Sequence, residues 1–231
     1  MLIGLTGTPG TGKTSISKIL SGRRGWKVIH LNELIREEHL YSEVDEKRDA
    51  VVADMDLVRA RLEKIIGKCC EDSKCCEDSK CCEDSKCCED SKCCEDSKCC
   101  EDSISKKRDI GKETGEAAVS GVIILESHMA HYIADFVIVL RAYPPELKKR
   151  LEARGYSDAK LGENAEAEAL DVILVEAFEW CKKVFEVNTT GKTPEESAAD
   201  VEYIIDHLLN GTEHELEAYK PGSLNWIDSV A

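Results

Sequence analysis

The chain begins "MLIGLTGTPGTGKTSISKIL", and residues of this stretch could hold a chain of phosphates. Gly7, Gly12, Lys13 and Thr14 match the phosphate-loop pattern of glycine, four residues, glycine, lysine, and serine or threonine. Glycines let successive backbone N–H groups converge on a phosphate, and a helix that starts there adds the positive end of its dipole. We expect Lys13 to bridge the outer phosphates of ATP and Thr14 to bind the Mg²⁺ that accompanies them.

The flanks of this loop favour the phosphate-binding interpretation over an ordinary glycine-rich turn. The apolar run "LIGLT" predicts a short buried strand before the loop, and the apolar residues after it fall on one face of a helix. We therefore expect the loop to contact ATP through Gly10, Gly12, Lys13, Thr14 and Ser15.

Apolar runs recur along the chain at intervals typical of a parallel sheet covered by helices. Besides the first run, strands are predicted at 28–31, 122–127, 135–142 and 184–188, all rich in Val, Ile and Leu, as in strands buried on both faces. Amphipathic patterns predict helices at 32–39, 54–66, 145–153, 165–183 and 194–209. This alternation predicts a doubly wound α/β fold with its active site at the carboxyl ends of the strands.

The six-residue word KCCEDS is repeated six times at residues 68–103 and holds 12 of the 13 cysteines. Neither a helix nor a strand of this word would have an apolar face. We therefore expect residues 67–118 to form a largely disordered inserted loop, which costs little in loop-closure entropy. The alternative is a metal-binding or redox module, since paired thiols bind soft metals, but the spacing differs from that of structural zinc sites.

The chain is acidic, with a formal net charge of −15. An acidic surface repels phosphates, so we expect no direct, general binding to nucleic acid. The sequence contains neither an apolar run long enough to span a membrane nor a secretory signal, and Cys181 is the one cysteine outside the repeat. We expect a cytoplasmic protein without a membrane partner.

Four stretches, in this order, resemble the small archaeal and eukaryotic adenylate kinases related to the coilin-interacting nuclear ATPase. They are "GLTGTPGTGKTS", "HLNELIREEHLY", "GVIILESH" and "RLEARGYSDAKLGENAEAE". The resemblance implies a P-loop nucleoside monophosphate kinase fold, with a five-stranded parallel sheet, helices on both faces and a short lid. It divides the chain into a kinase core (1–210) and a C-terminal tail (211–231). Within the core lie a monophosphate-binding segment (30–53) and the lid (153–163), and the loop 67–118 is inserted into it.

The resemblance also implies roles for basic residues. His30 and Arg36 would bind AMP, with the planar guanidinium of Arg36 on the α-phosphate, although Arg36 could also be a solvated helix charge. Arg150 and Arg154 are four residues apart, so both would project from one helical face towards the phosphates. Arg154 would contact ATP from the lid, where Lys160 is the only other cation, so we expect slower phosphoryl transfer than in long-lid enzymes.

Three further residues receive roles from the same resemblance. Glu126 takes the place of the family's aspartate and would have to fold back to hold Mg²⁺, or its water. His128 would orient a water for ATP hydrolysis, or is a packed histidine without a catalytic role. Lys192 resembles a family contact to ATP near the adenine ring.

Two functions follow from the resemblance and can coexist. One is transfer of the γ-phosphoryl of ATP to AMP or a related monophosphate, in which Lys13, Arg150 and Arg154 stabilise the transferring group. The other is an ATPase switch in late maturation of the small ribosomal subunit. Its partners would be ribosomal protein eleven of that subunit and the pre-30S particle, and a basic partner would suit the acidic surface.

Overall fold

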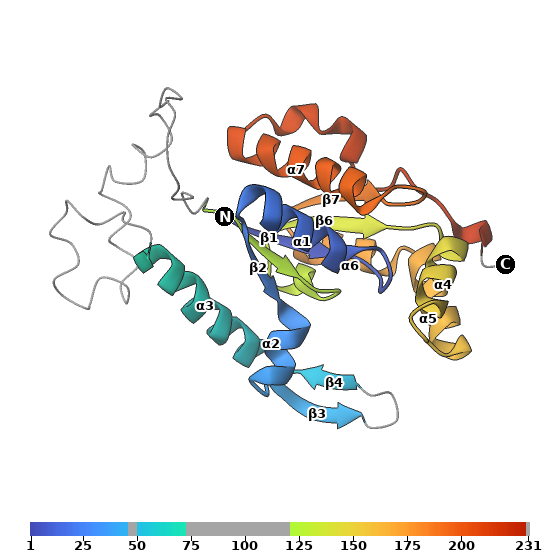
Figure 1. The fold of residues 1–231 in the computed structure, drawn as a ribbon, viewed down its shortest axis with the longest axis horizontal. Helices are drawn as coiled ribbons and strands as arrows, with labels where there is room; N and C mark the ends of the chain where they lie inside the picture. Colours follow the sequence, from blue (N-terminus) through green and yellow to red (C-terminus); the bar gives the residue numbers. More distant parts are fainter. Residues whose placement is uncertain (46–49, 73–120, 230–231) are drawn as a thin grey trace, which may run out of the picture. The chain divides into compact units, whose positions relative to one another are not determined.

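The computed structural model describes residues 1–45, 50–72 and 121–229 (Figure 1). The chain divides into two units, one formed by residues 1–59 and 119–231 and the other by residues 60–118. The first unit contains the sheet and every residue of the site discussed below. The described part of the second unit is the C-terminal portion of one helix, α3 (Met55–Asp72).

Five parallel strands form the central sheet in the order β2-β5-β1-β6-β7. They are β1 (Leu2–Thr6), β2 (Lys27–His30), β5 (Ile123–Glu126), β6 (Phe136–Arg141) and β7 (Lys183–Asn188). The register pairs Leu5 with both Glu126 and Ile138, so the residues that follow β1 lie beside the carboxyl ends of β5 and β6. The five-stranded parallel sheet predicted from the sequence is confirmed.

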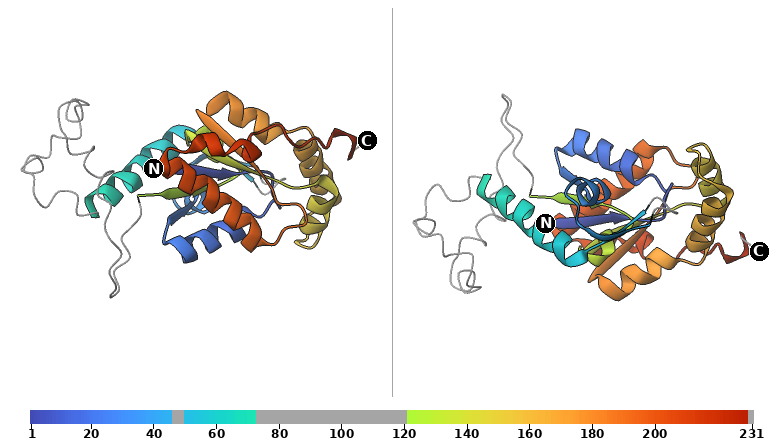
Figure 2. Two further views of the ribbon diagram at one scale, coloured as in Figure 1. Left: turned by 90° about the horizontal axis from the view of Figure 1, so that it is seen from above. Right: turned by 90° about the horizontal axis from the view of Figure 1, so that it is seen from below.

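Helices cover both faces of the sheet (Figure 2). On one face, α1 (Lys13–Arg24) and α7 (Pro194–Asn210) pack side by side, with Ile16, Leu20 and Ile204 in the main apolar cluster. On the other face, α6 (Val172–Trp180) packs on β6 through Leu174 and Ala177. The remaining helices of the first unit are α2 (Leu31–Glu37), α4 (Pro144–Glu152) and α5 (Asp158–Ala169).

One element was not expected from the sequence. An antiparallel pair, β3 (Tyr41–Asp45) and β4 (Ala50–Ala53), follows α2 inside the segment 30–53. β3 (YSEVD) has no apolar run, the apolar run of β4 (AVVA) is only four residues long, and Val44 and Val52 are exposed. The pattern that predicts buried strands is therefore missing here.

Three helix boundaries also differ from the prediction, and the first is the start of α5 at Asp158, before the expected 165. The single helix expected at 165–183 is interrupted, because Asp171 adopts a left-handed backbone conformation (φ 58°) between α5 and α6, and α6 ends before β7 begins at Lys183. The helix expected at 54–66 continues as α3 to Asp72, and so includes the first residues of the expected disordered insert. The rest of that insert, residues 73–118, lies outside the described residues.

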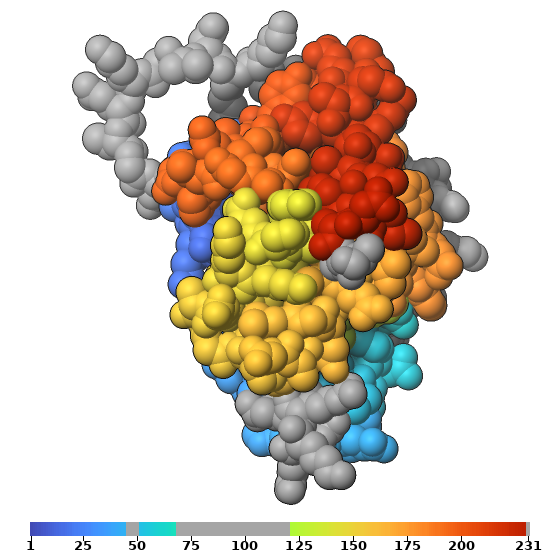
Figure 3. Space-filling view, turned by 90° about the vertical axis from the view of Figure 1, so that its right-hand side faces the viewer, coloured from blue at the N-terminus to red at the C-terminus, as the bar shows by residue number. Residues whose placement is uncertain are grey.

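The C-terminal tail packs on the core through three short 3-10 turns, η3 (Glu213–Glu215), η4 (Glu217–Tyr219) and η5 (Ile227–Ser229). Leu216 is buried in the main apolar cluster, and Tyr219 packs against it. In Figure 3 the red surface of the tail adjoins the yellow-to-gold surface that contains α4 and α5, and η5 contacts α5. Among the described residues, no helix has both the length and the apolar character to cross a membrane.

The start of α7 gives a first testable prediction. Thr193 Oγ1 accepts a hydrogen bond from Glu196 N (3.2 Å), and Glu196 Oε2 accepts one from Thr193 N (2.8 Å). Because this capping box satisfies two backbone donors, we expect Thr193→Ala to lower the free energy of unfolding by about 1 kcal/mol. Urea denaturation under reducing conditions measures the change.

Thr212→Ala is the matched control. Thr212 precedes η3 and its side chain makes no capping hydrogen bond, so the expected change is within about 0.5 kcal/mol. Equal losses in the two variants would contradict a specific contribution from the capping box.

Candidate active site

The phosphate loop, residues 7–12, connects β1 to α1 at the carboxyl edge of the sheet. Gly7, Gly10 and Gly12 have φ values of 137°, 94° and 101°, which residues with a side chain rarely adopt. Gly7 also lies so close to the Leu140 carbonyl oxygen that an added Cβ would clash with it. The glycines are therefore required both by the path of the turn and by its packing on β6.

Lys13 begins α1, and its side chain folds back over the loop. Its Nζ donates hydrogen bonds to the carbonyl oxygens of Gly7 (2.6 Å) and Thr8 (3.0 Å). Burial lowers the pKa of Lys13 to about 8, although the carboxylates of Glu126 and Glu168 oppose the shift. The ammonium group thus sits in a site built from oxygen acceptors, where phosphate oxygens could replace the two carbonyls.

Three adjoining hollows lie in this region, and Lys13 lines the middle one. The first, the donor cleft, has a volume of about 180 Å³ and is lined by loop residues together with Ser15, Arg150, Arg154 and Lys192. The second, the transfer centre, has a volume of about 190 Å³ and is lined by Lys13, Thr14, Asn32, Glu126, His128 and Arg154, among others. Arg154 lines both, so the donor cleft and the transfer centre adjoin.

The third hollow, the acceptor pocket, has a volume of about 430 Å³. It shares Asn32 and His128 with the transfer centre, so the three hollows form a continuous row. Arg36 lines it together with apolar residues, Ile35 and Val51 among them. This row has the arrangement that two nucleotides need in order to meet through their phosphates.

Glu126 lies between two partners in the transfer centre. Thr14 Oγ1 donates to Glu126 Oε1 over 3.4 Å, and the ring Nδ1 of His30 lies 2.7 Å from Glu126 Oε2. His30 and Glu126 are in register on the neighbouring strands β2 and β5, so the sheet itself sets this contact. One ring nitrogen of His30, a residue predicted to bind AMP, therefore contacts Glu126.

The residues around Glu126 fit a magnesium ion. Mg²⁺ prefers oxygen ligands and keeps several waters when it is bound with phosphates. The Thr14 hydroxyl and the Glu126 carboxylate supply such oxygens next to Lys13, at the mouth of the phosphate loop. These are the two residues that the sequence predicts as Mg²⁺ ligands.

Arg150 and Arg154 both line the donor cleft, but only Arg150 lies within α4, so they do not project from one helical face as their spacing predicts. Arg150 forms an ion pair with Glu146, donates to the carbonyl (2.9 Å) and hydroxyl (3.3 Å) oxygens of Thr189, and approaches Gly10 O at 3.5 Å. It therefore ties the phosphate loop to the segment after β7. Arg154 follows the end of α4 and is exposed, so the two arginines differ in how tightly the fold holds them.

His128 lies where the transfer centre meets the acceptor pocket. Burial lowers the pKa of its imidazole, and the nearby positive charge of Lys13 lowers it further. The ring is therefore mainly neutral at pH 7 and can accept a proton. Lys192 also lines the donor cleft, where its Nζ forms an ion pair with Asp200 (2.6 Å).

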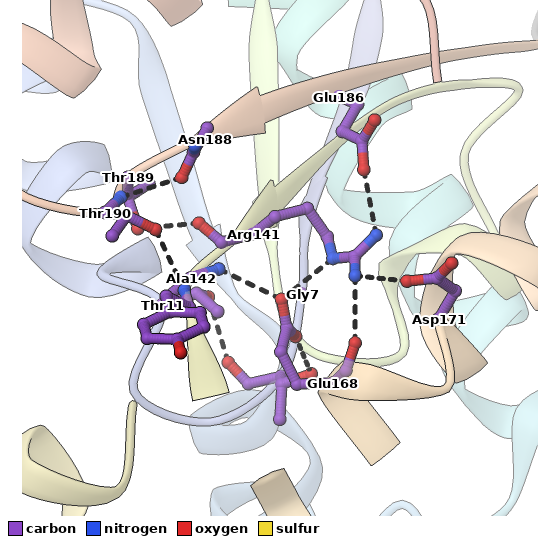
Figure 4. Close-up of polar contacts among 12 residues, drawn as sticks. Gly7, Thr11, Arg141, Ala142, Glu168, Asp171, Glu186, Asn188, Thr189 and Thr190 are labelled. Atoms are coloured by element: carbon purple, nitrogen blue, oxygen red, sulfur yellow. Dashed lines mark hydrogen bonds and ion pairs between the residues drawn. The ribbon is translucent and has the colours of Figure 1, made fainter. Parts of the chain in front are cut away.

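A buried ionic cluster next to the phosphate loop was not expected from the sequence (Figure 4). It consists of Arg141 at the end of β6 with Glu168, Asp171 and Glu186. The one available signal is the arginine that ends the apolar run "DFVIVLR", because an arginine there requires acidic partners. Those partners lie 27 to 45 residues away, and no local pattern identifies them.

Several archaeal proteins are similar to this chain over its full length. The profile of a family described as "AAA domain" matches residues 3–171. The chain is 59% identical over 230 residues to the "Putative adenylate kinase" of Methanosarcina barkeri, and 57% identical over 230 residues to that of Methanosarcina acetivorans. Both alignments cover 100% of each chain. The chain belongs to this archaeal adenylate kinase family.

Relatives in the adenylate kinase family extend to more distant archaea. The "Putative adenylate kinase" of Methanocaldococcus jannaschii is 34% identical over 229 residues, which cover 99% of this chain and 94% of that protein. Among solved structures, a shikimate kinase from Bacteroides thetaiotaomicron aligns with a TM-score of 0.46 at 16% identity, covering 89% of this chain and 98% of that one. So loose a likeness adds nothing to the family assignment.

The loop glycines lead to a second prediction. In Gly7→Ala the new Cβ would clash with the β6 backbone at a positive φ, so the loop must shift and lose its phosphate-binding shape. We expect the affinity for ATP with Mg²⁺ to fall at least about tenfold, as measured by calorimetry, since a nucleotide's phosphates bind mainly to these amides.

Gly22→Ala is the matched control, because Gly22 lies in α1 with nothing within 4 Å of an added Cβ. It should bind ATP as the unmodified protein does and gain up to about 1 kcal/mol in stability. Unchanged ATP affinity in a folded Gly7→Ala variant would show that this loop is not the phosphate site.

Proposed function

We propose that the chain transfers the γ-phosphoryl group of ATP to AMP or a related nucleoside monophosphate. The observation that carries this proposal is the row of three hollows, with the phosphate loop at one end and Arg36 at the other. A single-nucleotide hydrolase has no need of the larger acceptor pocket. The names of the relatives, adenylate kinases, agree with this reaction.

On the donor side, ATP would lie in the cleft beside α1 and α7. The loop amides and the α1 dipole would bind its phosphates, with Ser15 close by. Lys192 and Arg150 line the same cleft and would lie nearer the nucleoside and the phosphates respectively. The proposed lid, 153–163, would bring Arg154 onto ATP, and its closure would exclude water from the transfer centre.

On the acceptor side, the proposed monophosphate-binding segment is 30–53, which contains α2 and the β3–β4 pair. Arg36 would form a forked contact with the α-phosphate, and the side chains of Ile35 and Val51 would provide apolar contact for the base. His30 remains a proposed ligand of AMP, through Nε2, while its Nδ1 contacts Glu126.

The reaction at the centre requires positioning and charge neutralisation. An oxygen of the acceptor's α-phosphate forms a bond to the γ-phosphorus as the bond to the β–γ bridging oxygen breaks, leaving ADP on the donor side. Lys13 would leave the loop carbonyls for the β- and γ-phosphate oxygens, and Arg154 would offset the charge that develops on the transferring group. Mg²⁺, held by Thr14 and, directly or through water, by Glu126, would supply further charge neutralisation.

An ATPase switch for the small ribosomal subunit is the second candidate. The observation that favours hydrolysis is His128, whose neutral imidazole lines the transfer centre and could accept a proton from water. Ribosomal protein eleven and the pre-30S particle are the proposed partners, on the sequence resemblance and the net charge of −15. Neither of these two proposed functions assigns a role to the KCCEDS repeat.

Replacing the loop lysine tests the kinase proposal. Lys13→Ala should lower the rate of ADP formation from ATP and AMP by at least about 100-fold, because it removes a preorganised positive charge from the transferring phosphoryl group. A coupled assay with each nucleoside monophosphate measures the rate and identifies the preferred acceptor. Lys18→Ala, an exposed position on the same helix, should retain full activity. Persistent activity in Lys13→Ala would show the proposed reaction to be wrong.

Replacing His128 separates the two candidates. If this imidazole activates water, His128→Ala should reduce ATP hydrolysis at least about tenfold while leaving phosphorylation of AMP within about threefold. Both activities are read on the same preparation, with ATP alone and with ATP plus AMP. A parallel fall in both rates would assign His128 to phosphoryl transfer or to packing, and would remove the observation that favours a separate ATPase role.

A further inference from the structure

The ionic cluster around Arg141 is deeply buried, although removing charged groups from water costs free energy of folding. Arg141 and Glu168 are each 2% exposed and Glu186 is 4% exposed. Arg141 donates from Nε to Glu168 Oε1 (2.8 Å), from Nη1 to Glu186 Oε1 (2.8 Å), and from Nη2 to both the Glu168 carbonyl oxygen (2.9 Å) and the Asp171 carboxylate. One guanidinium thus faces three carboxylates. Burying such a set costs several kcal/mol per ion, so the cluster is poor evidence for stability and raises the question of what it positions.

Glu168 connects this cluster directly to the phosphate loop. Its Oε2 accepts a hydrogen bond from Thr8 Oγ1, and its Oε1 accepts one from Ala142 N (3.0 Å) as well as from Arg141. The carbonyl oxygen of Thr8 in turn accepts from Lys13 Nζ and from Thr11 Oγ1 (2.9 Å). Glu168 therefore holds the residue on which the resting position of Lys13 depends.

The C-terminal tail closes the opposite side of the cluster. Glu186 Oε2 accepts hydrogen bonds from Gly222 N (3.0 Å), Ser223 N (3.2 Å) and Ser223 Oγ (3.2 Å). The ring of Trp226 covers the Arg141 guanidinium at 5.0 Å from the ring centroid. Residues 222–226 thus supply the last hydrogen bonds to Glu186 and keep water from Arg141.

We propose that Glu168 is a positioning residue for the phosphate loop, and that the tail segment 222–226 is part of the same brace through Glu186 and Arg141. The brace fixes Thr8, and through it the loop amides and Lys13, in the shape that accepts the phosphates of ATP. Glu168 also lies near the end of α5, the helix that starts within the proposed lid, so the brace links the lid's supporting helix to the loop. The effect of the brace on catalysis rests on the proposed function, whereas its effect on ATP affinity can be measured without any kinase activity.

Thr8→Val tests the link to the loop, because it removes the hydroxyl with little change in shape. We expect the affinity for ATP with Mg²⁺, measured by calorimetry, to fall about tenfold, the loss typical of a hydrogen bond to a charged group. Thr8→Ser keeps the hydroxyl and should restore affinity to within about twofold. In the kinase assay the loss should appear in KM for ATP, with KM for AMP unchanged.

Trp226→Ala tests the tail, which lies far along the chain from the loop. It should weaken ATP binding about threefold, and the double variant with Thr8→Val should bind ATP no more weakly than Thr8→Val alone, because both changes act on one brace. Circular dichroism and the melting temperature of each variant establish that it is folded.

The outcomes separate the brace from a purely structural cluster. Loss of ATP affinity in Thr8→Val with recovery in Thr8→Ser, and a non-additive double variant, would support the proposal. Wild-type affinity in Thr8→Val, or a lower melting temperature in Trp226→Ala without any change in ATP affinity, would overturn it. Absence of AMP phosphorylation in the unmodified protein would defeat the proposed function, and the calorimetric comparison would still decide on the brace.

Discussion

The site depends on one constraint, a turn of positive-φ glycines packed against the end of β6. Gly7 lies against the Leu140 carbonyl oxygen, so the loop cannot move towards the sheet, and α1 begins directly after the loop. Such a turn is open on the ligand side and has little hydrogen bonding of its own. Its shape must therefore come from neighbours, and three side chains provide it: Lys13 on the carbonyls, Arg150 on Gly10 O and Glu168 on Thr8.

These contacts also prepare the site electrostatically. The donor groups that ATP would meet already have oxygen acceptors, since Lys13 donates to two carbonyl oxygens and the Thr14 hydroxyl donates to the Glu126 carboxylate. When a phosphate binds, its oxygens would replace the loop carbonyl oxygens as acceptors for Lys13 Nζ. Less reorganisation is needed than for groups taken from bulk water, which is the advantage of a preorganised site.

The sequence predicts the parts of this arrangement that depend on local pattern. The strands follow from apolar runs and the phosphate loop from the spacing around Lys13, whereas the roles of Arg154 and Lys192 in the donor cleft came from the family resemblance. The break between α5 and α6 does not follow from local pattern, because the pattern predicts one helix across it, at 165–183, whereas Asp171 leaves the helix and contacts Arg141, 30 residues earlier. The β3–β4 pair was missed because β3 is mostly polar and β4 has only four apolar residues, of which Val52 is exposed.

The pairing of His30 with Glu126 explains how a glutamate can stand where the resembling family has an aspartate. The extra methylene gives the carboxylate more freedom, so an unsupported glutamate would lose side-chain entropy on binding the proposed Mg²⁺. Here one oxygen is held by the His30 ring at 2.7 Å, from the in-register position on the next strand, and the other remains directed at Thr14. The sheet therefore fixes the Glu126 side chain through His30 on the neighbouring strand. Because the two residues are far apart in the sequence, no local pattern predicts this contact.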